Sequence, residues 1–302
     1  MSKNTFQSIE GTFLSSADDK TALYYKHFIP AQLKDAPIIH LFFQHGMIEY
    51  HKRHEEFFQF LLDHFSGNLI LSTMDLYGHG YSGGTRADIS KFEIFTQDMF
   101  NFIELSAKEF HLPERDYQTV LMGHSLGGLV ILKMLEEYKK KLNIKINKLI
   151  FVNPCISPEI AIPKKVESQL NETIPSVMKS IQVPVIYNGE DITSEQEKIE
   201  TFTLDPLISK SISIRLALET IKATHGIHSL SYFMSIPSLF LLSGDDRVVS
   251  LDRTQLFVTG MDKEIVETRF YSTMKHDLLN ETCRIEVFKE IITYLKKSKG
   301  LK

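Results

Sequence analysis

Two serines in this sequence lie between glycines in the pattern G-x-S-x-G, where a serine hydroxyl can serve as a nucleophile. Ser125 stands in GHSLG and Ser82 in GYSGG. A serine hydroxyl is a poor nucleophile until it is exposed, oriented and paired with a base. One arrangement that achieves this is a sharp turn from a strand into a helix, with flanking glycines that prevent steric clashes. The surroundings of each serine therefore decide between them.

Ser125 has the surroundings that such a turn requires. Apolar residues 120–122 are typical of the end of a buried strand, and leucines follow Ser125 at helical spacing. The N-terminus of that helix would direct backbone N–H groups and the positive end of its dipole toward the turn. Ser82 is followed by GGTRADIS, which has no helical apolar stripe. We therefore predict Ser125 as the nucleophile and interpret the segment around Ser82 as a flexible glycine loop.

Candidates for a base and an acid follow two later strands. Asp245 and Asp246 come just beyond the apolar run 238–242, and His276 follows the next predicted strand. The carboxyl ends of parallel strands share one edge of a sheet, so these side chains should converge with Ser125. The chain order Ser, Asp, His is the order expected of a serine hydrolase of this architecture. We predict His276 as the base, oriented by one of the two aspartates.

A tetrahedral intermediate also needs backbone donors for its oxyanion. The N–H of Leu126, the residue after the nucleophile, is one expected donor. The other should come from the loop after the third core strand, FFQHGMIEYH, where Gly46 allows a tight turn. We predict the N–H of Met47 as this second donor. His45 is interpreted as a residue that shapes the loop, not as a second base.

The elements that position these residues alternate between strand and helix along the first half of the chain. This alternation predicts a mostly parallel sheet with helices on both faces, an α/β fold. Two early strands should flank a polar turn at Asp18 and Asp19. Further strands are expected at 38–43, 68–74, 118–122 and 148–152, and helices at 55–65, 92–110 and 126–140.

The alternation breaks after Pro154. Residues 155–235 are rich in proline, serine and charge, and helical fragments such as 212–224 occur without clear intervening strands. The segment is too apolar for a disordered linker, so we predict a helical cap inserted into a core made of 1–154 and 236–302. Regular alternation resumes with strands at 237–242 and 265–271 and helices at 251–259 and 281–297.

Composition narrows the function classes. The chain has 302 residues, 43% of them hydrophobic, and a formal charge of −4, which gives no reason to expect a nucleic acid partner. Two cysteines form neither a disulfide framework nor a zinc site. No secretory signal and no apolar run of the ~20 residues that span a bilayer is visible. We therefore expect a soluble cytoplasmic protein, for which a lipid substrate would still allow peripheral contact with a membrane; oligomeric state is left open.

Other candidates have plainer interpretations. His51 and His54 have one-turn spacing, but a polar start of a helix explains them better than a metal site. The phenylalanines between 57 and 65 are interpreted as core packing. Leu207, Ile208 and the helix 212–218 could either pack in the core or line an acyl channel, and the sequence does not separate these two roles.

Taken together, these motifs resemble the α/β-hydrolase fold and, more narrowly, the monoacylglycerol lipase and lysophospholipase group, classed with serine aminopeptidase-like hydrolases. The matching segments span almost the whole chain: HGMIEYHKRHEEF, DLYGHGYSGGTRADI, GHSLGG, DPL at 205–207, DDRVV and KHDLLNE. In that group the GHGxSxG loop carries no catalytic serine, which agrees with the interpretation of Ser82.

The resemblance implies the roles of the site residues. It assigns the nucleophile to Ser125, the base to His276 and the oxyanion donors to Met47 and Leu126. The family's acid precedes one residue and then an apolar pair, which favours Asp246 over Asp245. It further implies hydrolysis of glycerolipid carboxylic esters through an acyl-enzyme, with a small lipid ester as substrate and neither cofactor nor metal.

Two other function classes remain. A peptidase or a thioesterase would use the same machinery on another acyl group, and only the pocket would distinguish it from an esterase. A non-catalytic binding protein on this fold would show decay of at least one position of the triad, and none is seen.

Overall fold

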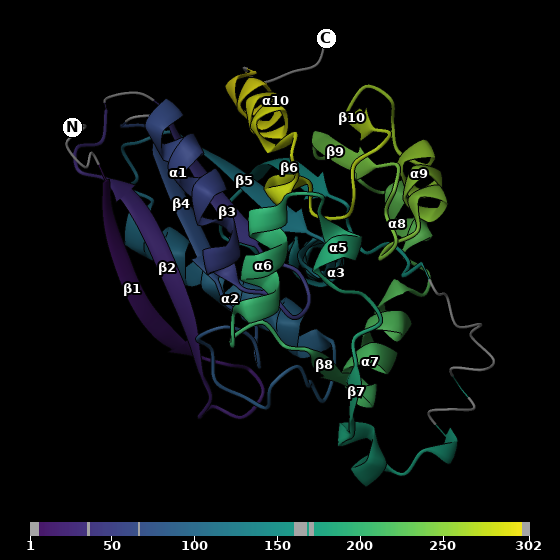
Figure 1. The fold of residues 1–302 in the computed structure, drawn as a ribbon. Coiled ribbons are helices and arrows are strands. Elements are labelled where there is room, and N and C mark those ends of the chain that lie inside the picture. The colour runs from purple at the N-terminus through teal and green to yellow at the C-terminus, as the bar shows by residue number, and fades with distance from the viewer. Residues whose placement is uncertain (1–5, 35–36, 66, 160–167, 169–171, 298–302) are drawn as a thin grey trace.

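The protein is described by a computed structural model that covers residues 6–34, 37–65, 67–159, 168 and 172–297. Within these ranges, one eight-stranded sheet has the order β1-β2-β4-β3-β5-β6-β9-β10 (Figure 1). Its strands are β1 (Phe6–Leu14), β2 (Ala22–Pro30), β3 (Ile38–Gln44), β4 (Leu69–Met74), β5 (Tyr117–His124), β6 (Ile146–Val152), β9 (Ser238–Ser243) and β10 (Val266–Tyr271).

The first two strands form an antiparallel hairpin at one edge of the sheet. The predicted polar turn joins them: the Asp18 side chain accepts the N–H of Thr21 at 2.8 Å, and Asp19 adopts a left-handed φ of 51°. Asp and Asn tolerate this conformation better than other non-glycine residues. Strand β2 pairs with β4 in antiparallel register, so the hairpin extends the sheet.

The remaining strands are parallel, as the alternation predicted. Strand β3 pairs with β4 and β5, and the parallel register continues through β6, β9 and β10. Every residue of β3 is buried, because helices cover both faces of a parallel sheet. The carboxyl ends of β5, β9 and β10 therefore lie at the same edge, where Ser125, Asp246 and His276 follow them.

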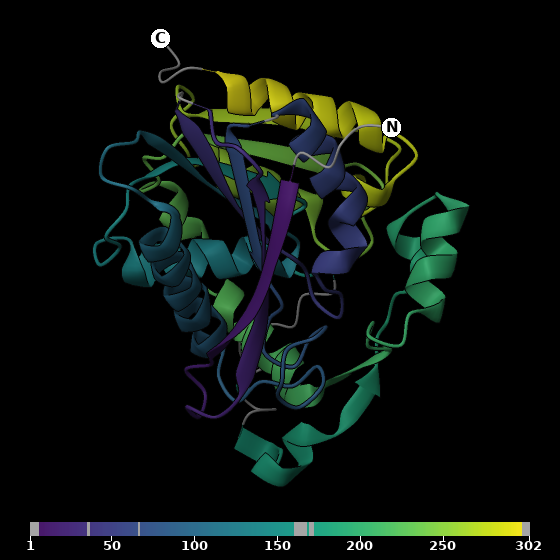
Figure 2. The same cartoon turned by 90° about the vertical axis from the view of Figure 1, so that its left-hand side faces the viewer.

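Helices form a layer on each side of the sheet. Figure 2 shows α1 (Glu55–His64) and α10 (Arg284–Lys296) on one side and α2 (Glu93–Phe110) and α3 (Leu126–Tyr138) on the other. One apolar core lies between the sheet and the first pair, and a second core lies between the sheet and the second pair. Helix α9 (Leu251–Thr259) joins the second core through Phe257. Phe57, Phe58 and Phe65 belong to the first core, as predicted.

The segment 155–235 contains strands that the sequence did not reveal. Residues 160–167 and 169–171 of this prediction lie outside the described residues. The elements described in it are η2 (Ser176–Ser180), β7 (Gln182–Pro184), α5 (Gly189–Ile192), α6 (Gln196–Leu204), β8 (Ser211–Ser213), α7 (Ile214–Thr224) and α8 (His228–Ser231). Strands β7 and β8 pair in a two-stranded sheet, and they are too short to leave a periodic signal in the sequence beside the helical fragments.

The predicted helix boundaries hold within a few residues, and the largest difference is at the start of the last helix. Helix α10 begins at Arg284 and not at 281, because Leu278–Asn280 forms a separate 3-10 turn (η3) just after His276. No helix in the described part of the chain is both long and apolar enough to cross a bilayer.

Candidate active site

Ser125 occupies a strained corner between a strand and a helix. Strand β5 ends at His124 and helix α3 begins at Leu126, so Ser125 is the single residue between them. Its φ of 51° and ψ of −119° lie in a region that a non-glycine residue rarely adopts. The Ser125 side chain does not cap α3, which leaves the hydroxyl available for chemistry. The predicted turn is therefore present.

The flanking glycines are required by close backbone approach. A Cβ atom on Gly127 would lie 2.2 Å from the carbonyl oxygen of Gln44 and 2.6 Å from that of His45. A Cβ atom on Gly123 would lie 2.6 Å from the N of Gly128. Glycine at 127 therefore allows α3 to pack against the end of β3, and glycine at 123 allows α3 to pack against β5. This contact also sets the loop after β3 against the Ser125 corner.

Ser82 has a different environment. It is 2% exposed, its Oγ donates to the carbonyl oxygen of Asp75 at 2.5 Å, and it accepts the N–H of Tyr24 at 2.9 Å. The hydroxyl is committed to holding the backbone of a loop, and no helix follows it, in agreement with the predicted loop. The two bonds tie the loop to β2 and to the residue that follows β4.

His276 is oriented by Asp246. Its Nδ1 lies 2.8 Å from Asp246 Oδ2, and both side chains are almost fully buried. The other oxygen of Asp246 accepts the N–H groups of Val248 and Val249 at 2.8 and 3.0 Å. Burial would raise the pKa of Asp246, but His276 and these N–H groups hold it below the usual value. The carboxylate is therefore ionised and accepts the Nδ1 proton, which leaves Nε2 free to act as a base.

Asp245 plays no part in this pair. Its side chain is 46% exposed and lies 3.6 Å from the exposed guanidinium of Arg247. The two aspartates are adjacent in sequence but point to different surroundings.

The loop after β3 lies against Ser125, the predicted nucleophile. A Cβ atom on Gly46 would lie 2.8 Å from Oε1 of Glu49 and 3.1 Å from Cβ of Ser125, so a larger residue would force these side chains to shift. His45 is fully buried; its Nε2 accepts the N–H of Leu76 at 3.0 Å and its Nδ1 donates to the Gly46 carbonyl at 2.8 Å. Both ring nitrogens thus form hydrogen bonds with backbone groups, which agrees with the predicted role of His45 in shaping the loop. Met47 follows, and Ile48 has a left-handed φ of 61°, a strained conformation for a β-branched residue.

Ser125 and His276 line one small hollow at the carboxyl edge of the sheet. Met47 and Ile192 contribute apolar surface to it, together with Phe202. Leu126, whose N–H is the other predicted donor, is buried at the first position of α3 beside Ser125. The free volume is about 10 Å³, room for about one water molecule, so a larger substrate requires the side chains over the hollow to move.

A buried charge pair lies directly beside Ser125. Glu49 Oε1 is 2.7 Å from Nδ1 of His124, the residue before Ser125, and accepts the N–H of Gly46 at 2.7 Å. Burial alone would lower the pKa of His124, but the Glu49 carboxylate raises it to about 9, so the imidazole is charged at neutral pH. Burial would raise the pKa of Glu49, and the neighbouring His54 and His124 hold it well below its usual value.

A second ion pair adjoins the first. Arg53 Nε donates to Asp277 Oδ2 at 2.9 Å and lies 3.4 Å from Glu49 Oε2. His54 Nε2 is 3.2 Å from Glu49 Oε1, and His51 Nδ1 is 2.8 Å from Asp75. His51 and His54 lie in a 3-10 turn (His51–His54) that leads directly into α1, which agrees with the predicted start of a helix, and they are only 2% and 1% exposed. Both serve as partners of buried carboxylates.

One group of residues in the described ranges could surround a metal ion, namely Glu49, His54 and His124. Their present contacts of 2.7 and 3.2 Å are those of hydrogen bonds, so the three ligand atoms would have to separate to hold an ion. The adjacent guanidinium of Arg53 would also repel a cation. These residues therefore fit a metal poorly and act as an ion-pair network.

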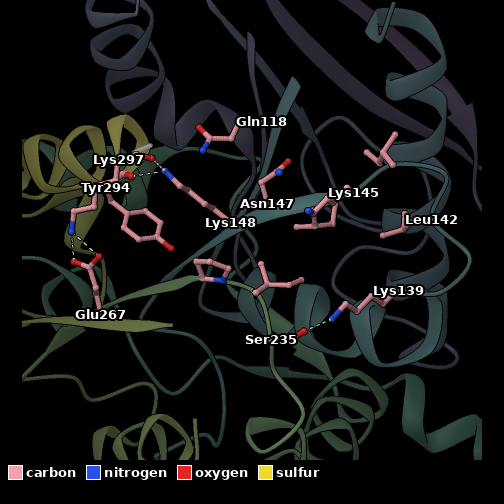
Figure 3. A pocket seen from close by; sticks show the side chains of 14 residues that line it. Gln118, Lys139, Leu142, Lys145, Asn147, Lys148, Ser235, Glu267, Tyr294 and Lys297 are labelled. Atoms are coloured by element: carbon pink, nitrogen blue, oxygen red, sulfur yellow. Dashed lines mark hydrogen bonds and ion pairs between the residues drawn. The ribbon is translucent and has the colours of Figure 1, made fainter. Parts of the chain in front are cut away.

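A much larger cavity, of about 730 Å³, lies at the opposite edge of the sheet, near the amino ends of β6 and β9 (Figure 3). Three of its charged side chains are paired within it: Lys148 Nζ donates to the carbonyl oxygens of Tyr294 and Lys297 at 2.8 and 2.7 Å, and Lys297 donates to Glu267 at 2.6 Å. No serine–histidine–carboxylate combination lines it. The candidate site residues therefore line the small hollow and not the larger cavity.

The sequence did not reveal the Glu49–His124 pair. Both residues stand inside motifs that it did identify, the loop HGMIEYH and the elbow GHSLG. They are 75 positions apart, and only the parallel pairing of β3 with β5 brings their segments together. The signal that could have suggested a pair was the ionisable side chain in each of these two motifs, because a charge buried beside a parallel sheet needs a partner.

Comparison with known proteins adds independent findings. A family model described as "Serine aminopeptidase, S33" matches residues 35–283. A phospholipase of Bacillus subtilis, YtpA, is 27% identical over 84% of this chain and 94% of its own length. The monoglyceride lipase of Rattus norvegicus is 24% identical over 92% of this chain and 88% of its own length.

Among solved structures, a soluble variant of the monoglyceride lipase from Saccharomyces cerevisiae, in complex with a substrate analogue, superimposes with a TM-score of 0.75. The alignment covers 94% of this chain and 96% of that chain at 18% sequence identity. The likeness in architecture confirms the fold predicted from the sequence, a mostly parallel sheet between two layers of helices.

Proposed function

The chain belongs to the serine aminopeptidase S33 family of α/β-hydrolases, and we propose that it is a serine hydrolase that cleaves carboxylic esters of glycerolipids. The observation that carries the proposal is the placement of Ser125 in one hollow with His276, whose ring is held by Asp246 at 2.8 Å. The monoglyceride lipase and phospholipase relatives support a lipid ester as the substrate class.

In this proposal Ser125 attacks the ester carbonyl while Nε2 of His276 takes the hydroxyl proton. Asp246 keeps the proton of His276 on Nδ1 and stabilises the charged imidazolium that forms. The N–H groups of Met47 and Leu126 receive the developing oxyanion. His276 then protonates the departing alcohol, and the acyl group stays on Ser125. A water molecule activated by His276 releases the acid and restores the serine.

Two sides of the hollow favour an amphiphilic ester. The apolar side continues into a cluster in which Ile48 and Ile208 pack with Phe202, suited to a hydrocarbon chain. The other side is polar, with Glu49, His124 and Asp277 in the lining. An ester that joins an acyl chain to a polyol matches both surfaces.

Charge balance favours an ester over a peptide. An aminopeptidase must bind the ammonium group of its substrate, for which a free carboxylate is suited. Here Glu49 is paired with His124, and Asp277 with Arg53. Each buried carboxylate is thus already neutralised, and a further cation would gain little.

We also propose that residues 155–235 form a cap over the hollow. Tyr187, Ile192 and Phe202 from this segment line it. The segment is fastened to the core where Tyr50 donates to Asp205 at 2.8 Å, within the motif DPL. Because the hollow is nearly closed, the cap has to shift when substrate enters.

The test is hydrolysis of a substrate panel by the wild-type protein and by Ser125→Ala. The panel contains monoacylglycerols, lysophospholipids, short p-nitrophenyl esters, thioesters and aminoacyl amides. We expect wild-type hydrolysis of the glycerolipid esters, with no hydrolysis above background by Ser125→Ala. Preferential cleavage of the amides or thioesters would contradict the proposed substrate class, although Ser125 could remain the nucleophile.

A further inference from the structure

The corner that follows β6, residues 152–155, holds the backbone of Ser125 from two sides. The N–H of Ser125 donates to the carbonyl oxygen of Val152 at 3.0 Å, and the N–H of Cys155 donates to the carbonyl oxygen of Ser125 at 3.0 Å. Pro154 packs against α3, since a Cβ atom on Gly128 would lie 2.7 Å from its ring. The position of the nucleophile is therefore fixed relative to this corner.

Asn153, in the middle of the same corner, reaches the other half of the site. Its Nδ2 donates to the carbonyl oxygen of His276 at 2.6 Å and to Ser243 Oγ at 2.7 Å. Its Oδ1 accepts the N–H of Ser243 at 2.8 Å. Both amide donors and the acceptor are thus used, and Asn153 is only 3% exposed.

The backbone of Asn153 is adapted to this task. Its φ of 42° is left-handed, and its N–H donates to the carbonyl oxygen of Leu241 at 3.0 Å. Asparagine is among the few non-glycine residues that adopt this conformation readily. The left-handed turn at the end of β6 brings the amide to the loop of His276, across the end of β9.

We propose that Asn153 is a positioning residue of the hydrolysis, which sets the separation between Ser125 and His276 through its bond to the His276 carbonyl. This inference rests on the proposed function. The corner fixes the Ser125 backbone, and the amide of the same corner fixes the His276 backbone, so one rigid unit spans the two reacting side chains. Loss of the amide lets the His276 loop shift, and a displacement of about 1 Å costs about a hundredfold in rate.

The alternative role for Asn153 is structural, in which its bonds stabilise the fold without affecting the chemistry. The two roles differ in what they change. A structural residue alters the melting temperature and leaves kcat unchanged in the folded protein. A positioning residue lowers kcat at a temperature where the variant is folded, with KM little affected, because bound substrate meets a misplaced base.

The experiment compares Asn153→Gly with Asp98→Asn. Glycine keeps the left-handed φ and removes only the side chain. Asp98 is a matched control, because it is also buried and bonds two groups, Ser15 Oγ at 2.7 Å and the N–H of Ser16 at 2.6 Å, far from the site in sequence. Steady-state kinetics on a monoacylglycerol, fluorophosphonate labelling rates and the low-field proton NMR signal of His276 Nδ1 are measured well below the melting temperature of each variant.

We expect kcat and the labelling rate of Asn153→Gly to fall about a hundredfold, with KM within about twofold and a shifted or broadened Nδ1 signal. Asp98→Asn should keep the wild-type kcat even where its melting temperature falls. If Asn153→Gly does not fold, Ser243→Ala serves in its place: it removes the hydroxyl that accepts from the Asn153 amide at 2.7 Å and donates to the carbonyl oxygen of Lys275 at 2.6 Å, and it should lower kcat severalfold.

A folded Asn153→Gly variant with wild-type kcat, labelling rate and Nδ1 signal would overturn the positioning role. If Asn153→Gly does not fold and Ser243→Ala does, a wild-type kcat in Ser243→Ala would overturn it as well. Absence of wild-type labelling at Ser125 would instead overturn the proposed function, and the two failures are therefore distinguishable.

Discussion

His276 Nδ1 lies 2.8 Å from Oδ2 of Asp246, a residue 30 positions earlier in the chain, whereas the neighbouring Asp245 side chain is 46% exposed. The difference arises because Val248 and Val249 turn their N–H groups back onto Asp246 and hold its carboxylate inside the loop. One aspartate is thereby committed to the histidine and the other to the surface.

The first prediction concerns this pair. Asp246→Asn should lower kcat by about 10³–10⁴-fold, because an amide stabilises the wrong tautomer of His276 and cannot stabilise the imidazolium. Asp245→Asn is the matched control and should keep kcat within about twofold of the wild type. Steady-state hydrolysis of a p-nitrophenyl ester measures both. Equal losses in the two variants would show that the acid has been misassigned.

A second prediction concerns the pH dependence of stability. The pKa of His124, lowered by burial but raised more strongly by Glu49, is about 9 in the folded protein, above the usual value for histidine. The folded state therefore keeps a proton that the unfolded chain releases near pH 6.5. The stabilisation is complete below that pH, declines as pH rises and is lost above about pH 9, a change of a few kcal/mol in the free energy of unfolding.

Urea unfolding of the wild type and of Glu49→Gln between pH 6 and 9.5 measures this decline. Lys148, whose pKa burial lowers to about 8, titrates in the same range in both proteins, so the difference between the two profiles isolates the Glu49–His124 pair. The difference should shrink steadily as pH rises. Asp98 bonds a serine and not a histidine, so the stability of Asp98→Asn should change with pH in parallel with that of the wild type. A difference that is constant with pH would show that His124 is neutral.

Gly127→Ala gives a third prediction. The added Cβ would lie 2.2 Å from the carbonyl oxygen of Gln44, two residues before Gly46, so α3 or the loop carrying Met47 has to move. We expect a stability loss of about 1–3 kcal/mol and a fall in kcat of about a hundredfold. The control is Gly226→Ala, where no atom lies within 4 Å of the added Cβ. Gly226→Ala should lower the stability, because alanine is strained at the φ of +75° found there, and should leave kcat unchanged. A wild-type kcat in folded Gly127→Ala would show that the close contact between α3 and the end of β3 is not needed for catalysis.

The fourth prediction tests the cap. Phe202 on α6 is 5% exposed and lines the hollow, whose free volume is about 10 Å³. Phe202→Ala should lower the melting temperature, since a buried aromatic side chain is lost, and should raise the ratio of kcat/KM for a long-chain monoacylglycerol over a short ester. Leu204→Ala on the same helix removes a side chain that is 79% exposed and should change neither quantity. An unchanged ratio in Phe202→Ala would mean that the acyl chain enters elsewhere.

The fold could be predicted because its signals are local. A strand such as β3, buried at every position, appears in the sequence as a continuous apolar run, and a helix such as α3 appears as leucines at helical spacing. The turn at Ser125 was predictable for the same reason, since the strand, glycines and helix that create it are adjacent in the chain.

The rest depends on contacts between distant segments. The sequence could not show that Glu49 contacts His124. A buried charge is stable only beside a partner, and the register of the sheet determines which residue lies close enough to be that partner. It could not show the left-handed turn at Asn153, which follows an ordinary strand. The strands β7 and β8 were missed because each has three residues, which is too few to show the alternation of apolar and polar residues typical of a strand.

The central claim is that Ser125 is the nucleophile, and covalent labelling with a fluorophosphonate, located by peptide mass spectrometry, tests it most directly. Wild type and Ser82→Ala should each carry one adduct, on the peptide that contains residue 125, and Ser125→Ala should carry none. Persistent labelling of folded Ser125→Ala, or an adduct at residue 82 in the wild type, would contradict the account.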